Sequence, residues 1–125
     1  KTGEGGPLPR EPKPEAGQAP NEPSGLRAVA TVDKANNLLT ITTTWTDESL
    51  WAGQALTDRL SLFEIELSAP NVSPTFTKTL RRDSNEHKFS VTLRPYAGKT
   101  ATITLWAQNW RGKSKNVTVE VKIPE

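Results

Sequence analysis

From residue 26 to the end of the chain, apolar and polar residues alternate with a period of two. The clearest case is residues 117–123, in which valine or isoleucine occupies every second position and threonine, glutamate and lysine stand between them. Such alternation predicts a β-strand with one buried face, a setting that suits threonine and valine. No stretch of ten or more residues carries a sustained helical repeat of apolar residues, so helix is expected at most as a turn within residues 47–58.

The alternation predicts seven short strands, at residues 26–32, 39–45, 60–68, 75–81, 88–93, 100–108 and 117–123. In the third strand, Phe63, Ile65 and Leu67 are expected to face the core, with Glu64 and Glu66 on the wet side. Two prolines and Asn71 before the fourth strand favour a turn or an edge position there, because proline cannot donate to a strand ladder. Each sheet can bury its apolar face only against another sheet. The predicted fold class is therefore all-β, a seven-stranded antiparallel two-sheet sandwich.

The first 24 residues differ in composition from the rest, since they hold six of the ten prolines and one large aliphatic residue, Leu8. Proline fixes φ and removes an amide donor, so this segment is expected to be extended or disordered. We predict a proline-rich linker over residues 1–24 and a folded domain over residues 25–125. The stretch PLPREPKP has two interpretations, a ligand for an aromatic groove or an interdomain spacer, and the spacer is favoured. A spacer implies another domain upstream in the parent protein.

Charge and cysteine content exclude several classes of function. Sixteen basic and fourteen acidic residues nearly balance, so no nucleic-acid partner is expected. The chain has no cysteine, which excludes disulfides, thiolate catalysis and cysteine-ligated metal centres. No apolar run reaches the roughly 18–20 residues that span a bilayer, so membrane insertion is not expected.

Catalytic and metal-binding patterns are weak in this sequence. His87 is the only histidine, and its polar surroundings predict a solvated turn residue with no nucleophile beside it. The acidic pairs at residues 47–48 and 64–66 suit hydrolase carboxylates only if a cleft brings them together, and a filled sandwich has none. Oxygen-bearing side chains at residues 83–86 lack the spacing of a calcium loop. We therefore predict no enzyme activity, no cofactor and no metal site.

Three segments carry motifs that fit one known family. Trp45 ends the strand that begins at Leu39, Phe63-Glu-Ile65 stands in the third strand, and residues 103–114 read Ile-x-Leu-x-Ala-x-Asn-x-x-Gly-x-Ser. From residue 23 to residue 125 the chain thereby resembles a fibronectin type III domain, the cysteine-free relative of the immunoglobulin sandwich. The resemblance implies that Trp45 packs between two sheets.

One position departs from the family pattern. Ala101 stands where the family usually has a tyrosine whose hydroxyl ties the preceding corner to the backbone, and the nearest tyrosine is Tyr96. Two interpretations stay open. Either Tyr96 takes over that role, or the corner between Leu93 and Ala101 is looser than usual.

Tryptophan supplies the candidate binding site. Trp106 falls on the polar face of its strand, and Trp110 follows in the next loop. The candidate binding residues are Trp51, Trp106, Trp110, Arg111 and Lys113. Aromatic and arginine side chains are enriched in binding hot spots, which favours a recognition patch. The structural interpretation is that lysine or arginine stems, the loop at residues 46–59 or the proline-rich segment cover Trp106.

Two surface features have simple explanations. Asn71 and Asn116 each begin an Asn-x-Ser/Thr sequon, expected to be exposed and glycosylated only if the source is a secreted eukaryotic protein. Basic residues cluster around Arg81 and Arg82, and we interpret them as a solvated edge whose charges discourage pairing between edges.

These expectations converge on a non-catalytic module. We predict a spacer or an adhesion and protein-interaction domain of a larger extracellular, cell-surface or virion-surface protein, such as a phage-tail protein. Its expected partners are another protein or neighbouring domains of the same chain, and the isolated domain is expected to be monomeric. The alternative is a receptor-type ligand-binding module that uses Trp106, Trp110 and the loop at residues 109–114. A spacer should bury Trp106 within its own chain, whereas a receptor should expose an apolar patch around both tryptophans.

Overall fold

The computed structural model describes residues 19–46, 50 and 62–125. Over these residues the chain forms eight strands and one short 3-10 helix, η2. The elements are β1 (Ser24–Asp33), β2 (Leu38–Thr46), β3 (Leu62–Ser68), β4 (Phe76–Arg81), β5 (Glu86–Thr92), η2 (Arg94–Tyr96), β6 (Thr100–Asn109), β7 (Gly112–Lys113) and β8 (Val117–Lys122).

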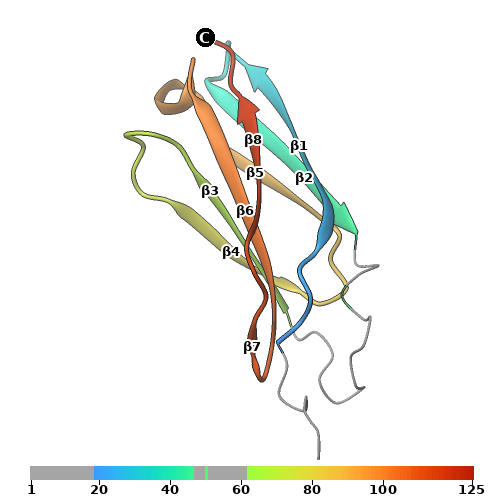
Figure 1. Ribbon diagram of the computed structural model, residues 1–125. Coiled ribbons are helices and arrows are strands. Elements are labelled where there is room, and N and C mark those ends of the chain that lie inside the picture. The colour runs from blue at the N-terminus through green and yellow to red at the C-terminus, as the bar shows by residue number, and fades with distance from the viewer. Residues whose placement is uncertain (1–18, 47–49, 51–61) are drawn as a thin grey trace, which may run out of the picture.

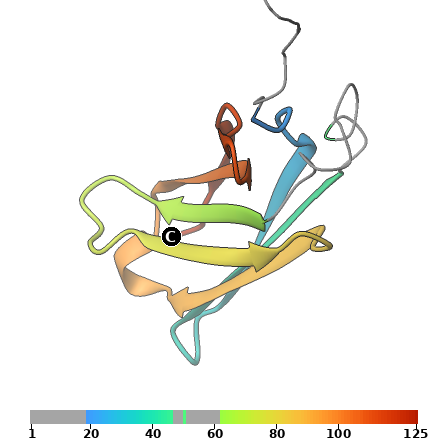
Figure 2. The ribbon, with the colours of Figure 1, turned by 90° about the horizontal axis from the view of Figure 1, so that it is seen from below.

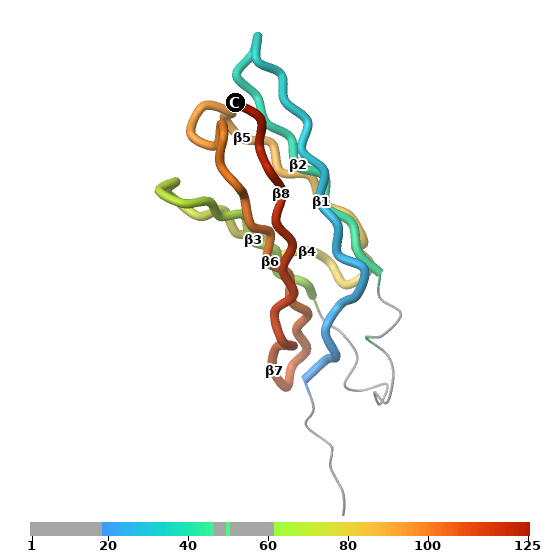
Figure 3. The backbone as a smooth tube through the Cα atoms, turned by 45° about the horizontal axis from the view of Figure 1, so that its top comes forward, coloured from blue at the N-terminus to red at the C-terminus, as the bar shows by residue number. Residues whose placement is uncertain are grey.

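The strands form two antiparallel sheets. One sheet has the order β1-β2-β5, and the other has the order β4-β3-β6, with β7 and β8 both paired to the outer edge of β6. Figures 1 and 2 show the two layers facing each other. On one side β1 runs beside β8 (Figure 3), and on the opposite side β4 and β5 are the terminal strands of their sheets. The predicted all-β, two-sheet sandwich is confirmed.

Alternation along each strand builds the core between these layers. In β6, buried and half-buried residues alternate over the whole strand, and β2 buries Leu39, Ile41 and Trp45 in the same way. Trp45 is 4% exposed and packs edge-on against Phe63 of β3, with 5.4 Å between the ring centroids. Because β2 and β3 belong to different sheets, this pair joins the two layers. The predicted position of Trp45 in the core is confirmed.

The structure divides the last edge of the sandwich into two strands, where the sequence pattern predicts one. β8 corresponds to the predicted strand at residues 117–123, and the two-residue β7 precedes it on the same edge of β6. Ser114 stands between them and fixes this junction. Its amide donates to the carbonyl of Ala107 at 2.7 Å, and its Oγ accepts from the Ala107 amide at 2.9 Å. β7 is too short for alternation to reveal it.

The folded unit begins before residue 25. Ser24 already belongs to β1, and Pro20 and Pro23 are buried. Proline brings no amide donor, so burying it leaves no N–H without a partner. Residues 1–18 lie outside the described residues, and for them the proline-rich linker stays a prediction.

Tyr96 lies in the corner between β5 and β6, where one interpretation of the sequence assigns it the hydroxyl tie of the family. The Tyr96 amide donates to the carbonyl of Leu93 at 2.8 Å, and the amide of Lys99 donates to the Tyr96 carbonyl at 3.0 Å. The side chain is 2% exposed, yet its hydroxyl has no hydrogen-bond partner among the described residues. Tyr96 therefore fills the corner by packing and does not supply the hydroxyl tie.

Candidate functional site

The hairpin between β6 and β7 carries most of the candidate binding residues. Asn109 pairs with Gly112 in the strand register, which leaves Trp110 and Arg111 at the tip. The Asn109 side chain is buried, and its Oδ1 accepts hydrogen bonds from the amides of Arg111 at 2.8 Å and Gly112 at 3.1 Å. Asparagine commonly forms such turns with the backbone that follows it. The tip is thus held by side-chain and backbone contacts of its own hairpin.

Gly112 completes the turn with a backbone that other residues rarely adopt. Its φ is 147°, in the region that favours glycine. A Cβ at this position would lie 3.7 Å from the Ala19 methyl group, an ordinary contact, so the requirement is conformational and not steric. Each residue of the Asn-x-x-Gly-x-Ser motif therefore has a structural role. Asn109 accepts hydrogen bonds from the tip, Gly112 allows the turn, and Ser114 bonds the returning chain to β6.

Trp110 and Arg111 form an exposed pair at the tip. The Trp110 side chain is 64% exposed, and the Arg111 guanidinium carbon lies 3.8 Å from the centroid of its ring. A cation over an indole face at an exposed site contributes about 0.5–1 kcal/mol. The tip thereby presents an apolar surface with a positive charge beside it.

Trp106 has a different setting from Trp110. It is half-buried on the outward face of β6, as its place in the alternation predicts. The ammonium nitrogen of Lys113 lies 4.5 Å from the centroid of the Trp106 ring. The Lys113 ammonium group therefore stands over one face of this indole.

Four of the five candidate binding residues lie on one hairpin: Trp106, Trp110, Arg111 and Lys113. The fifth, Trp51, lies outside the described residues, as do the acidic residues 47–48. Asn71 and Asn116 are exposed, as expected for their sequons.

His87 requires a correction, because the structure places it inside β5 and not in a turn. It pairs with Thr43 of β2, whose hydroxyl donates to the His87 carbonyl at 2.7 Å, so the β2–β5 ladder extends further than the polar sequence around His87 suggests. The imidazole is half-buried and meets the Phe89 ring edge-on at 4.7 Å between centroids. Burial lowers the pKa of His87, and the nearby positive charge of Lys78 lowers it further.

A pH dependence of stability follows from this lowered pKa. The unfolded chain binds a proton near pH 6.5 and the folded chain only below that, so folding stability should fall as the pH drops from about 6.5 through the folded pKa. An imidazole titration by NMR should place the His87 pKa below 6.5. Lys78→Gln should raise it only in part, because burial is the larger cause, and Lys122→Gln should leave it unchanged. A pKa at or above 6.5 would contradict the described burial.

The acidic residues do not assemble into a reactive site in the described part of the chain. Glu64 and Glu66 lie on the outward face of β3, and Glu64 accepts a hydrogen bond from the Thr79 hydroxyl. Asp83 pairs with Arg81 at 3.5 Å on the surface. Among residues 19–46, 50 and 62–125, no three histidine, aspartate or glutamate side chains gather as metal ligands would.

Comparison of the fold with solved structures identifies its type. No family model and no curated protein matches the sequence. The fn3 domain of the human collagen alpha-1(XX) chain superposes with a TM-score of 0.61 at 14% identity, over 84% of this chain and 86% of that one. The FN5 domain of Drosophila Lar gives 0.57 at 14% identity, over 85% and 98%. The FN1-FN3 domains of chicken CNTN1 give 0.61 at 14% identity, over 86% and 33%.

The fold is that of a fibronectin type III domain. These neighbours confirm the resemblance carried by Trp45, Phe63 and residues 103–114. No helix among the described residues has the length and apolar character needed to span a membrane.

This fibronectin type III-like domain carries its candidate residues at the end where the described chain begins. Figures 1 and 3 show residues 19–23 running beside the β6–β7 hairpin, with the C-terminus at the opposite end. Ala19 lies close to Gly112, as its 3.7 Å distance from a Cβ at that position shows. The first described residue, Ala19, therefore lies next to the β6–β7 hairpin.

Proposed function

We propose that this fibronectin type III-like domain is a non-catalytic interaction module that contacts another protein, or a preceding part of its own chain, through the Trp110–Arg111 tip. The observation that carries the proposal is a 64% exposed tryptophan on a hairpin that Asn109 holds in place. Tryptophan and arginine dominate binding hot spots. A tip that is already ordered loses little conformational entropy on binding.

A spacer role is compatible with the same structure. Pro20 and Pro23 are buried and Ala19 lies against the hairpin, so the segment that leads into the domain is packed onto it. Packing of this kind limits the orientations available to whatever precedes the domain. The collagen and Lar structures are each described as one domain of a named protein. By that analogy we propose that this module is one domain of a larger protein, and the extracellular or surface location stays part of the proposal.

The receptor-type alternative requires Trp106 to take part in binding. Lys113 lies over the Trp106 ring, and a partner would have to displace it. Trp110 also has a cation beside its ring, with Arg111 at 3.8 Å from the centroid, but its side chain is 64% exposed whereas Trp106 is half-buried. We therefore place the contact at the tip and not over the whole Trp106–Trp110 surface.

Photo-crosslinking in the full-length protein tests this proposal. A photoreactive amino acid at position 110 should crosslink to one defined peptide of a partner or of the preceding chain. The same residue at position 29, where Val29 is 63% exposed on β1, is the matched control and should not give that product. Equal products from both positions would contradict the proposal.

Substitution at the tip should separate binding from folding. Trp110→Ala should weaken association with the crosslinked partner by roughly tenfold or more, as expected for a hot-spot residue. The unfolding free energy should change by no more than about 1 kcal/mol, because the side chain is exposed and its contact with Arg111 is worth about that much at most. Unchanged affinity in a titration calorimetry experiment would rule out the tip as the contact.

A further inference from the structure

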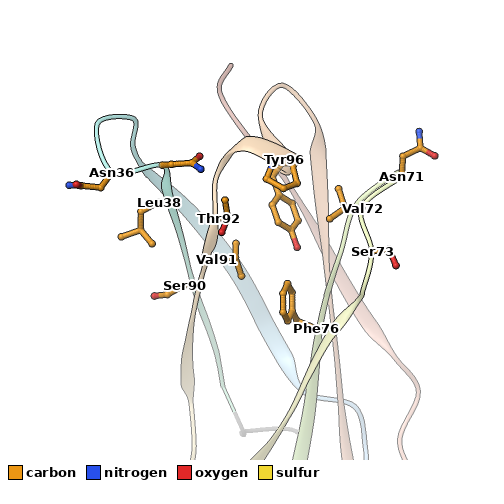
Figure 4. Close-up of a pocket in the computed structure, with 12 residues that line it drawn as sticks. Asn36, Leu38, Asn71, Val72, Ser73, Phe76, Ser90, Val91, Thr92 and Tyr96 are labelled. Atoms are coloured by element: carbon orange, nitrogen blue, oxygen red, sulfur yellow. The ribbon is translucent and has the colours of Figure 1, made fainter.

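A groove opens on the side of the sandwich where β4 and β5 end the two sheets. Its upper part has a volume of about 650 Å³ and a mixed lining, in which asparagine, serine and threonine alternate with apolar side chains that include Val72, Phe76, Val91 and Tyr96 (Figure 4). A second hollow of about 190 Å³ continues it along the two strands and shares Phe76 and Val91 with the first. We call this continuous surface the edge groove.

An unsatisfied polar group points into the edge groove. The Tyr96 side chain is 2% exposed, and its hydroxyl has no hydrogen-bond partner among the described residues. Figure 4 shows the hydroxyl directed into the groove, toward Phe76. Buried polar groups in folded proteins nearly always have a partner, so an exception calls for an explanation. The hydroxyl itself is buried, so a ligand carbonyl that displaces the side chains around it would accept the missing hydrogen bond.

Both walls of the edge groove are strand edges. β4 pairs only with β3, and β5 pairs only with β2, among the described residues. A terminal strand presents unpaired backbone amides and carbonyls along its outer edge. An extended peptide can add to such an edge through main-chain hydrogen bonds, while alternate side chains enter neighbouring pockets. The backbone of such a peptide also supplies the carbonyl that Tyr96 lacks.

The charge of the edge groove selects among peptides. Lys78 and Lys88 line its lower part together with His87, and none of the described lining residues is acidic. A second copy of this chain is a poor occupant, since pairing β4 with β4 would bring Lys78 and Arg81 of both copies together. A partner with carboxylates at this position would meet complementary charge.

We propose that the edge groove binds an extended peptide of a partner protein that places an apolar side chain between Phe76 and Val91 and carboxylates beside Lys78 and Lys88. One backbone carbonyl of the peptide accepts a hydrogen bond from the Tyr96 hydroxyl. The remaining main-chain groups pair with the free edge of β4 or β5. This site is separate from the Trp110–Arg111 tip, so the two proposals can fail independently.

Selection of a displayed library of short random peptides against the 125-residue chain tests the proposal. We expect enriched sequences that combine an apolar residue with aspartate or glutamate and contain no proline in the paired stretch. A synthetic copy of an enriched peptide should shift backbone amide signals of β4 and β5 in NMR spectra. No enrichment, or shifts confined to other strands or to the β6–β7 hairpin, would overturn the proposal.

Matched variants measure which contacts hold the selected peptide. Lys78→Glu combined with Lys88→Glu should weaken its binding roughly three- to tenfold, whereas Lys122→Glu on β8 should not. Tyr96→Phe should weaken binding about fivefold, as expected for one hydrogen bond, with an unchanged circular dichroism spectrum. Equal binding by all three variants would contradict the assigned contacts.

Two other arrangements, a second copy of the chain in the groove and the peptide at the hairpin, give distinct results. Sedimentation that shows dimers at rising concentration, with β4 amides protected from exchange, would assign the groove to a second copy and overturn the peptide proposal. Trp110→Ala should leave the selected peptide bound, and a loss in that variant would place the peptide at the hairpin.

Discussion

Replacing Trp45 with alanine is expected to lower the free energy of unfolding by about 3–5 kcal/mol, the usual cost of removing a large aromatic side chain from a core. Trp45 is 4% exposed and meets Phe63 edge-on across the two sheets. Its loss would leave a cavity between β2 and β3 that the rigid ladders on either side cannot close. Urea denaturation followed by circular dichroism gives the change in unfolding free energy directly.

Trp45→Phe is the matched control for this prediction. The smaller ring keeps an aromatic contact with Phe63, and it removes an indole N–H that has no hydrogen-bond partner among the described residues. Phenylalanine should therefore cost far less than alanine. If alanine and phenylalanine cost the same, or if alanine costs under about 1 kcal/mol, Trp45 does not hold the two sheets together.

Asn109→Ala should cost about 2 kcal/mol, because two backbone amides of the hairpin lose their acceptor. The Oδ1 of Asn109 accepts from Arg111 at 2.8 Å and from Gly112 at 3.1 Å. Alanine cannot replace either bond, and both amides would have to find water by opening the tip. Hydrogen exchange should then become faster at residues 111 and 112 while the amides of β3 keep their protection.

Asn116→Ala provides the control, because Asn116 is an exposed asparagine just before β8. It should change the unfolding free energy by less than about 0.5 kcal/mol and leave exchange at the tip unaltered. Exchange at residues 111 and 112 that is unaffected by Asn109→Ala would show that the hairpin is held in another way. Trp110 would then lack the rigid support on which the proposed contact depends.

The sequence predicts the sheets well because burial in a sandwich follows the pleat. Phe63, Ile65 and Leu67 of β3 are all buried, as their alternation with glutamate indicates. The same rule places Trp106 on the outward face of β6. A strand with one buried face has a strong period-two pattern in its sequence. The motif around Asn109 and Gly112 likewise indicates the hairpin that follows β6.

Features that depend on contacts between distant segments could not be predicted in this way. β7 has only two residues, and His87 joins β5 because Thr43 of another strand pairs with it. Pro20 is buried although its neighbours along the sequence resemble a linker. Local composition carries no information on these partners.

The same contrast between local pattern and contacts of distant segments applies to the two candidate sites. Trp110 and Arg111 could be chosen from residue type and position in a loop, and the structure places them at the tip of one hairpin. The edge groove could not be foreseen, because Tyr96, Phe76 and Val91 come from three separate elements. The Tyr96 hydroxyl has no hydrogen-bond partner among the described residues, and the only sign of this in the sequence is that the tyrosine does not stand at position 101.

The most direct test of this account is an NMR measurement of nuclear Overhauser effects between the ring protons of Trp45 and Phe63. The two rings lie 5.4 Å apart between centroids and belong to strands of different sheets, so cross-peaks between them report that the layers face each other. We predict strong cross-peaks together with slow amide exchange in β2 and β3. Absence of these cross-peaks from a folded sample, with a solvent-accessible Trp45 indole, would contradict the sandwich on which the hairpin site and the edge groove both rest.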